Sequence, residues 1–202
     1  MKVGFDLDGV LVDFSSAYQQ LFVALTGEDK FLPGDAEGPP TWDWPKLRGY
    51  TPLSVRTVWN HINSSHDFWR MLPRIEKNVS ILYDHIHKLN RKHELYFATN
   101  RTGIMVKDQT EQWLRVHIAD GLTVLIVAPQ TKGLVARALQ LDCYVDDNYD
   151  NCIDCVRESP ITRTYLVNRR YNRAPVTGTV ELIESRRIAG VGEFLRRENL
   201  VD

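Results

Sequence analysis

The sequence predicts an α/β protein: a doubly wound, Rossmann-like parallel sheet with a small, mainly helical insertion after the first strand. Five short runs of consecutive apolar residues have the continuous pattern of strands that are buried on both faces. Helical patterns separate most of these runs, and this alternation is typical of a parallel sheet covered by helices on both sides. One interval, between the first two runs, is too long for a single crossover connection, which indicates an insertion.

The expected strands are short apolar runs bounded by polar residues or turns. In chain order they cover 2–6 (KVGFD), 94–99 (ELYFAT), 123–128 (TVLIVA), 143–147 (CYVDD) and 164–168 (TYLVN). The expected helices have apolar residues spaced three or four positions apart. They cover 79–90, 106–119, 132–141 and, near the end of the chain, 191–200.

Nearly ninety residues separate the first two expected strands. The helix at 79–90 serves the crossover, so we expect residues 15–76 to form the insertion, with 1–14 and 77–202 as the core. Within the insertion, two helical patches flank a Pro/Gly/Trp-rich middle, and four of the five tryptophans lie there. Because the insertion follows the carboxyl end of a strand, it is placed to cover a site at that edge of the sheet.

Composition excludes several classes of function. The chain has 202 residues, 43% of them hydrophobic, which suits a globular protein with one core. A net charge of −1 gives no overall attraction for nucleic acid or an anionic membrane. No apolar run approaches the ~20 residues that span a bilayer, and the N-terminus begins with a strand rather than a signal peptide. We therefore expect a cytoplasmic protein without a membrane or nucleic-acid partner; a homodimer is compatible with the sequence.

Two clusters in the last third have a structural interpretation. The three cysteines are too few and odd in number for a disulfide framework, which favours a reducing cytoplasm. Cys152 and Cys155 form a C-x-x-C without a second nearby pair, and the run 147–158 resembles a helix, so we expect buried thiols rather than a metal or redox site. Arginines also crowd the last fifth, where we expect a solvated surface. They are Arg163, Arg169, Arg170, Arg173, Arg186, Arg187, Arg196 and Arg197.

Polar residues follow four of the expected strands at the ends that a parallel sheet brings to one edge. The first strand ends in two acids that share a face, just before a glycine that lets the backbone approach a ligand closely. Hydroxyl, amide, amine and carboxylate groups follow the other strands. The full set is Asp6 and Asp8, Thr99 and Asn100, Lys132, and Asp146 with Asp147.

Each residue type in this set answers a chemical need. Several carboxylate oxygens around one point describe a magnesium site, which also takes water and substrate phosphate. A hydroxyl, backbone amides at a turn and a lysine describe a phosphate cradle. A carboxylate held beside a bound phosphoryl group can act as a nucleophile. A second acid two residues later can protonate the leaving oxygen and then deprotonate water.

The motifs resemble those of the haloacid dehalogenase-like superfamily of phosphohydrolases. The resemblance rests on DLDGV (6–10), TNR (99–101), Lys132 and the acidic pair of YVDDN, in that order, and covers the core from 1 to about 150. The insertion is placed like that family's cap. Within the superfamily, DLDGVLVDF followed by DFWRMLP (67–73) is similar to the 5'(3')-deoxyribonucleotidases, which remove phosphate from nucleoside monophosphates.

The resemblance implies a role for each residue of the set. Asp6 would be the nucleophile and a metal ligand, and Asp8 the general acid/base with its backbone carbonyl on the metal. Thr99 and the amide of Asn100 would hold the phosphoryl oxygens, while Lys132 would offset charge near the aspartyl phosphate. Of the acidic pair, the resemblance favours Asp147 as the direct ligand, with Asp146 behind it or on a metal-bound water.

Aromatic residues at the start of the insertion and within it are candidates for contact with a base or sugar, because aromatic faces stack on bases. They are Phe14, Phe68 and Trp69, for which packing in the cap's own core is the alternative. One position departs from the nucleotidase pattern. Where those enzymes show a second small hydroxyl residue after the threonine, this chain has Asn100 followed by Arg101, which leaves the substrate open and adds Arg101 as a candidate for substrate contact.

The leading hypothesis is a Mg2+-dependent phosphatase of small phosphomonoesters, in particular nucleotides, acting through an aspartyl phosphate. A second hypothesis keeps this intermediate but changes the substrate or acceptor to a sugar phosphate, a phosphomutase reaction or a nucleic-acid end. The near-neutral charge disfavours the last, because strand binding normally uses a basic groove. A third is a non-catalytic binding module that retains the fold.

Overall fold

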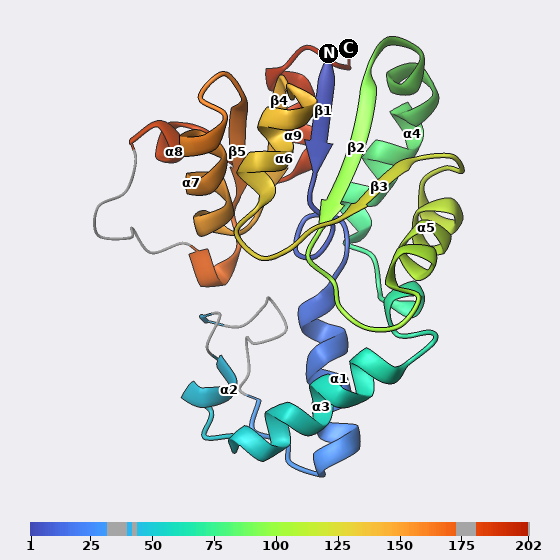
Figure 1. Cartoon of the computed structure of the whole chain (residues 1–202), viewed down its shortest axis with the longest axis vertical. Coiled ribbons are helices and arrows are strands. Elements are labelled where there is room, and N and C mark those ends of the chain that lie inside the picture. Colours follow the sequence, from blue (N-terminus) through green and yellow to red (C-terminus); the bar gives the residue numbers. More distant parts are fainter. Residues whose placement is uncertain (32–39, 42–43, 173–180, 202) are drawn as a thin grey trace.

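In the part of the chain that the structure describes, the sheet has six parallel strands in the order β3-β2-β1-β4-β5-β6 (Figure 1). The computed structural model describes residues 1–31, 40–41, 44–172 and 181–201. The strands are β1 (Lys2–Phe5), β2 (Glu94–Thr99), β3 (Thr123–Ile126), β4 (Cys143–Asp146), β5 (Arg163–Val167) and β6 (Arg187–Ile188). The chain builds outward from β1 to β3 and then returns to β4 on the other side of β1. Ligands of open α/β sheets bind at this kind of topological switch point.

The predicted fold class is confirmed, and all five expected strands are present within one or two residues. The sixth strand was not predicted. Its two residues, Arg187–Ile188, pair with Leu166 and Val167 at the sheet edge and are too short to show an apolar run. The short helix α8 (Glu181–Ser185), which precedes it, was not predicted either.

Helices cover both faces of the sheet. On one face lie α4 (Glu76–Lys92), α5 (Val106–His117) and α9 (Val191–Arg197); on the other lie α6 (Lys132–Leu139) and α7 (Tyr149–Glu158). Phe5 of β1 illustrates the first face: its ring stacks on Phe97 at 5.7 Å and meets Phe194 edge-on at 5.6 Å. On the second face Gly4 is required, since a Cβ there would lie 2.6 Å from the ring of Tyr144.

The interval between β1 and α4 holds a separate group of helices beyond the carboxyl ends of the strands, at the opposite end of the molecule from both termini (Figure 1). It contains α1 (Phe14–Thr26), α2 (Trp44–Leu47), α3 (Pro52–Ser64) and the 3-10 turn η2 (Trp69–Met71). Asp13 caps α1, because its carboxylate accepts hydrogen bonds from the backbone and hydroxyl of Ser16. We call this segment, 15–76, the cap; its boundaries stay a prediction.

The remaining sequence expectations concern cysteines, arginines and membranes. All three thiols are buried, and the C-x-x-C lies on α7 as predicted. Several arginines of the last fifth pair with acids at the surface, as Arg197 does with Glu193. Arg173 lies outside the described residues, as does Trp42, a tryptophan of the Pro/Gly/Trp-rich middle of the insertion. Within the described ranges no helix is long and apolar enough to cross a membrane.

Candidate active site

The loop after β1 places Asp6 at the centre of the sheet's carboxyl edge. The backbone amide of Asp6 still donates to Val145 of β4 at 2.8 Å, so this residue continues the ladder. The chain then turns tightly, and Gly9 takes a φ of +82° that favours glycine. Asn78 of α4 donates from its side chain to the carbonyl of Val10 at 2.6 Å and anchors the loop. Strand pairing and the anchored loop thereby fix the backbone at Asp6 from which its carboxylate projects.

Lys132 links the two halves of the site. It is the first residue of α6, its side chain is 3% exposed, and its Nζ lies 2.9 Å from Asp6 Oδ1 and 2.9 Å from Asp146 Oδ2. Burial by itself would lower the pKa of Lys132, but the two carboxylates outweigh it and raise that pKa, so the amine is charged. Tyr144 and Asn151 also donate hydrogen bonds to Asp146, which is therefore fully engaged.

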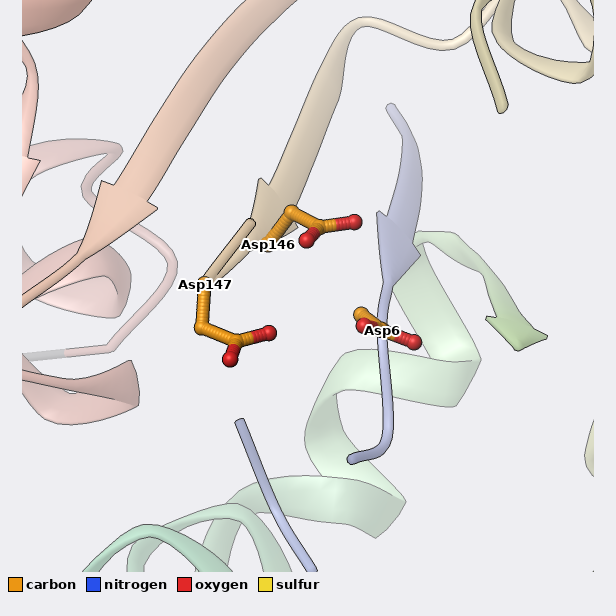
Figure 2. Close-up of side chains that lie close together, drawn as sticks. All are labelled: Asp6, Asp146 and Asp147. Carbon is orange, nitrogen blue, oxygen red and sulfur yellow. The ribbon is translucent and has the colours of Figure 1, made fainter. Parts of the chain in front are cut away.

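The carboxylates of Asp6, Asp146 and Asp147 come together between the ends of β1 and β4 (Figure 2), each offering an oxygen within 4.8 Å of the others. Burial raises the pKa of Asp6 well above its usual value, and the neighbouring acids add to the rise that Lys132 opposes. Burial and the charge of Asp146 raise the pKa of Asp147 to about 7. Three buried carboxylates thus lie together while Lys132 contacts two of them, Asp6 and Asp146, and a divalent cation would balance the remaining negative charge.

Asp147 provides a more specific indication of a cation. Tyr171 donates to its Oδ2, and Asn172 donates to its backbone carbonyl at 2.6 Å. Its Oδ1, in contrast, is buried and has no hydrogen-bond partner among the residues that the structure describes. A buried carboxylate oxygen without a donor is costly unless it binds a cation. The residues present therefore fit a hard divalent metal between Asp6 and Asp147.

Asp8 lies beside this group but is held from a different side. Its carboxylate, 23% exposed, accepts two hydrogen bonds from the guanidinium of Arg101 and one from the hydroxyl of Thr99 at 3.1 Å. The side chain of Arg101 is completely buried and is not among the residues that line the cavity described next. The structure thus places Arg101 behind Asp8 rather than on a surface that a substrate would touch.

A cavity of about 600 Å3 lies between this edge of the sheet and the cap. Its floor contains the predicted catalytic and phosphate-binding residues, and its cap side is aromatic. Of the three aromatic residues predicted to contact substrate, Phe14 and Trp69 line it. Phe68 does not; it packs edge-on against the other two. The predicted residues among its lining are Asp6, Asp8, Phe14, Trp69, Thr99, Asn100, Lys132 and Asp147.

Sequence reasoning missed two groups of residues. Tyr18 and Trp59 also line the cavity, together with Trp44, a tryptophan of the Pro/Gly/Trp-rich middle for which packing or lining the entrance was expected. Tyr18 could have been found, because it follows Phe14 by four residues on α1 and so shares its face; their rings stack at 5.3 Å. The second group, Tyr171 with its neighbour Asn172, holds Asp147 from the segment after β5. No local pattern connects these residues to Asp147, so only the folded chain reveals them.

The comparisons with known proteins agree with this geometry. The family model described as "5' nucleotidase, deoxy (Pyrimidine), cytosolic type C protein" (NT5C) matches residues 1–178. The HAD-hydrolase YfnB from Bacillus subtilis, solved bound to magnesium, has a TM-score of 0.60 at 14% identity over 98% of each chain. CbbY from Rhodobacter sphaeroides, in complex with xylulose-(1,5)bisphosphate, has a TM-score of 0.54 at 14% identity over 95% of each chain. At these identities the two structures show a shared fold. No curated protein sequence matches the chain.

Proposed function

We propose, from the premise that this chain belongs to the NT5C family of 5'-deoxynucleotidases and is a phosphatase-type hydrolase of the HAD superfamily, that it removes phosphate from (deoxy)nucleoside monophosphates. In this proposal the reaction depends on Mg2+ and passes through a phosphoryl group carried by Asp6. The family's description names a cytosolic protein, which agrees with the expected cytoplasmic location. A homodimer, which the sequence allows, stays untested.

The observation that carries the proposal is the position of Asp6. It lies on the floor of the cavity, with a carboxylate oxygen 2.9 Å from the charged Nζ of Lys132. Beside it lies Asp147, whose buried Oδ1 has no hydrogen-bond partner among the described residues. A volume of about 600 Å3 is within the usual range for small-molecule sites. The opposite wall is aromatic, which suits a flat base above a phosphate held at the floor.

Each residue has a defined task in the proposed reaction. Asp6 attacks phosphorus, and Asp8 gives a proton to the leaving oxygen and later takes one from water. Thr99 and the backbone of Asn100 hold the phosphoryl oxygens, and Lys132 favours the ionised form of Asp6 and offsets developing charge. Asp6, Asp147 and the backbone of Asp8 would hold Mg2+, with Asp146 behind them. When bound, Mg2+ would neutralise charge on the phosphoryl group.

The direct test is phosphate release from a panel of nucleoside monophosphates, with sugar phosphates and 5'-phosphorylated oligonucleotides alongside, with Mg2+ and after chelation. We expect the highest kcat/KM with a nucleoside monophosphate and loss of turnover after chelation. Higher kcat/KM with a sugar phosphate, or salt-sensitive activity on oligonucleotides, would support the second hypothesis, in which the same intermediate serves another substrate. Absence of turnover on the whole panel would favour the binding module.

The raised pKa of Asp147 predicts a coupling between pH and Mg2+. The folded value of about 7 lies above the unfolded one, so without metal the contribution of Asp147 to stability is present at low pH and lost as pH rises through about 7. Because Mg2+ binds the ionised form, its affinity should rise over the same range. Thermal melts from pH 5.5 to 8.5, with and without Mg2+, should show metal stabilisation growing with pH. In Asp147→Asn that growth should shrink; an unchanged pH dependence would contradict the prediction.

The aromatic wall predicts different effects for two phenylalanines. Phe14→Leu removes a ring that lines the cavity, whereas Phe68→Leu removes one that does not. Stacking on a base is worth about 1–3 kcal/mol, so KM for a nucleoside monophosphate should rise roughly tenfold in Phe14→Leu only. Glycerol phosphate, which has no base, should show no such rise with either variant. Equal KM values for the nucleotide in both variants would place the base elsewhere.

A further inference from the structure

The buried guanidinium of Arg101 is not used by the reaction proposed above. Its side chain is 0% exposed, and it follows Thr99 and Asn100 at the end of β2. Because arginine stays protonated at all relevant pH values, burying it is costly without well-placed partners. Its partners therefore indicate what the residue is for.

Each nitrogen of this guanidinium makes a defined hydrogen bond. Nε donates to Asp8 Oδ2 at 2.9 Å and Nη2 to Asp8 Oδ1 at 2.8 Å, while Nη1 donates to Thr110 of α5 at 3.1 Å. Its Cζ lies over the ring of Trp69, 5.0 Å from the ring centroid. Trp69 is itself fixed, because its Nε1 donates to the carbonyl of Thr102 at 2.9 Å. The arginine is thus held rigidly between α5 and the cap.

Two parallel hydrogen bonds fix both the position and the plane of the carboxylate that accepts them. Asp8 lines the cavity, and Arg101 adds two hydrogen bonds to the one that its carboxylate accepts from the hydroxyl of Thr99. A proton donor must lie within hydrogen-bond reach of the leaving oxygen, and a displacement of about 1 Å costs on the order of 10²-fold in rate. A lysine would supply the charge without the two-point geometry.

We propose that Arg101 is a positioning residue for Asp8: it fixes the orientation in which Asp8 exchanges its proton, and Trp69 couples that orientation to the seating of the cap. This inference deepens the proposed function and rests on it. When an oxygen of Asp6 bonds to phosphorus, the bond from phosphorus to the leaving oxygen breaks, and its electron pair takes the proton of Asp8. Asp8 regains a proton from the water that then releases phosphate from Asp6.

The test compares two substrates that differ in their need for a proton. From a deoxynucleoside 5'-monophosphate the nucleoside leaves as an alkoxide, which is a poor leaving group without a proton. From p-nitrophenyl phosphate the nitrophenol leaves as a stable phenolate. General acid catalysis is worth about 10²–10⁴-fold, so Arg101→Ala should lower kcat/KM by about 10²-fold with the nucleotide and by less than about tenfold with p-nitrophenyl phosphate. Arg101→Lys should fall between, and added guanidinium should restore part of the loss in Arg101→Ala.

Arg163→Lys is the matched control, because Arg163 makes a similar two-bond pair with Glu198 far from the cavity, at 3.0 and 2.7 Å. Both its kcat/KM values should stay at the wild-type level. If Arg101→Ala does not fold, Thr110→Val, which removes a partner of Arg101 without touching Asp8, should show a smaller loss with the same substrate bias.

The outcomes distinguish the positioning role of Arg101 from the proposed phosphatase function. Equal losses on both substrates, or no loss on either, would overturn the positioning role while wild-type turnover upholds the proposed function. A wild-type protein that hydrolyses neither substrate would remove the proposed function and this inference together. A larger loss with the nucleotide, restored by guanidinium, supports both.

Discussion

Asp6→Asn should abolish phosphate release, with a fall in kcat on the order of 10⁴-fold or more, because loss of a nucleophile removes the covalent route. The substitution keeps the shape of the side chain. The remaining carbonyl oxygen can still accept from Lys132 and from the amide of Leu7, which lie 2.9 and 2.8 Å from Oδ1 of the aspartate. It also removes one of three crowded buried charges. The variant should therefore fold and melt no lower than wild type in the absence of Mg2+.

Asp13→Asn is the control for this substitution. It changes another aspartate of the same stretch, but one that caps α1 and does not line the cavity. Because asparagine is also a good N-cap, stability and kcat should stay near wild type. The measurement is phosphate release on the best nucleotide of the panel, together with thermal melts of all three proteins. If Asp6→Asn turned over at a rate comparable to wild type, the assignment of the nucleophile would be wrong.

Lys132→Met should destabilise the protein as well as inactivate it. The lysine ammonium is the shared partner of Asp6 and Asp146, and removing one partner of a buried ion pair costs about 3–5 kcal/mol because the other charges stay buried and unpaired. Loss of a preorganised positive group beside the phosphoryl oxygens should lower kcat by about 10²–10³-fold in addition. Urea unfolding, with and without Mg2+, measures the first effect, and phosphate release measures the second.

Two further variants show whether the loss comes from this buried charge. Lys107→Met removes a surface lysine that pairs with Glu111 on α5, and should cost less than about 1 kcal/mol. Lys132→Met combined with Asp146→Asn removes an unpaired acid together with its partner, and should recover part of the stability. A Lys132→Met protein as stable as wild type would show that the lysine is not the countercharge of the site.

The sequence predicted the core and the floor of the cavity well, for identifiable reasons. Strands buried on both faces need continuous apolar runs, and crossover helices need a period near 3.6, so both leave strong local patterns. Parallel strands also bring their carboxyl ends to one edge. Residues directly at those ends, such as Asp6, Thr99 and Asp147, were therefore expected together, and the structure gathers them around one cavity. Their catalytic roles stay a proposal.

Residues away from the strand ends were predicted less well. Arg101 lies only two residues beyond β2, yet its side chain turns behind Asp8 toward α5 instead of into the cavity. Phe68 packs behind the aromatic wall although its neighbour Trp69 lines it. Irregular backbone has no fixed period, so sequence spacing does not state which way such side chains point. The strand β6 was not predicted for a related reason, since its two residues are too few to show an apolar run.

By itself the sequence determined the doubly wound sheet, the inserted helices and the polar residues at the sheet's carboxyl edge, because periodicity and chain direction are local properties. Only the tertiary structure decided which groups touch: Lys132 between Asp6 and Asp146, Tyr171 on Asp147, and Arg101 on Asp8. These contacts join segments far apart in the chain. Their geometry is set by the packing of helices against the sheet and by the need of each buried charge for a partner, which no single segment encodes.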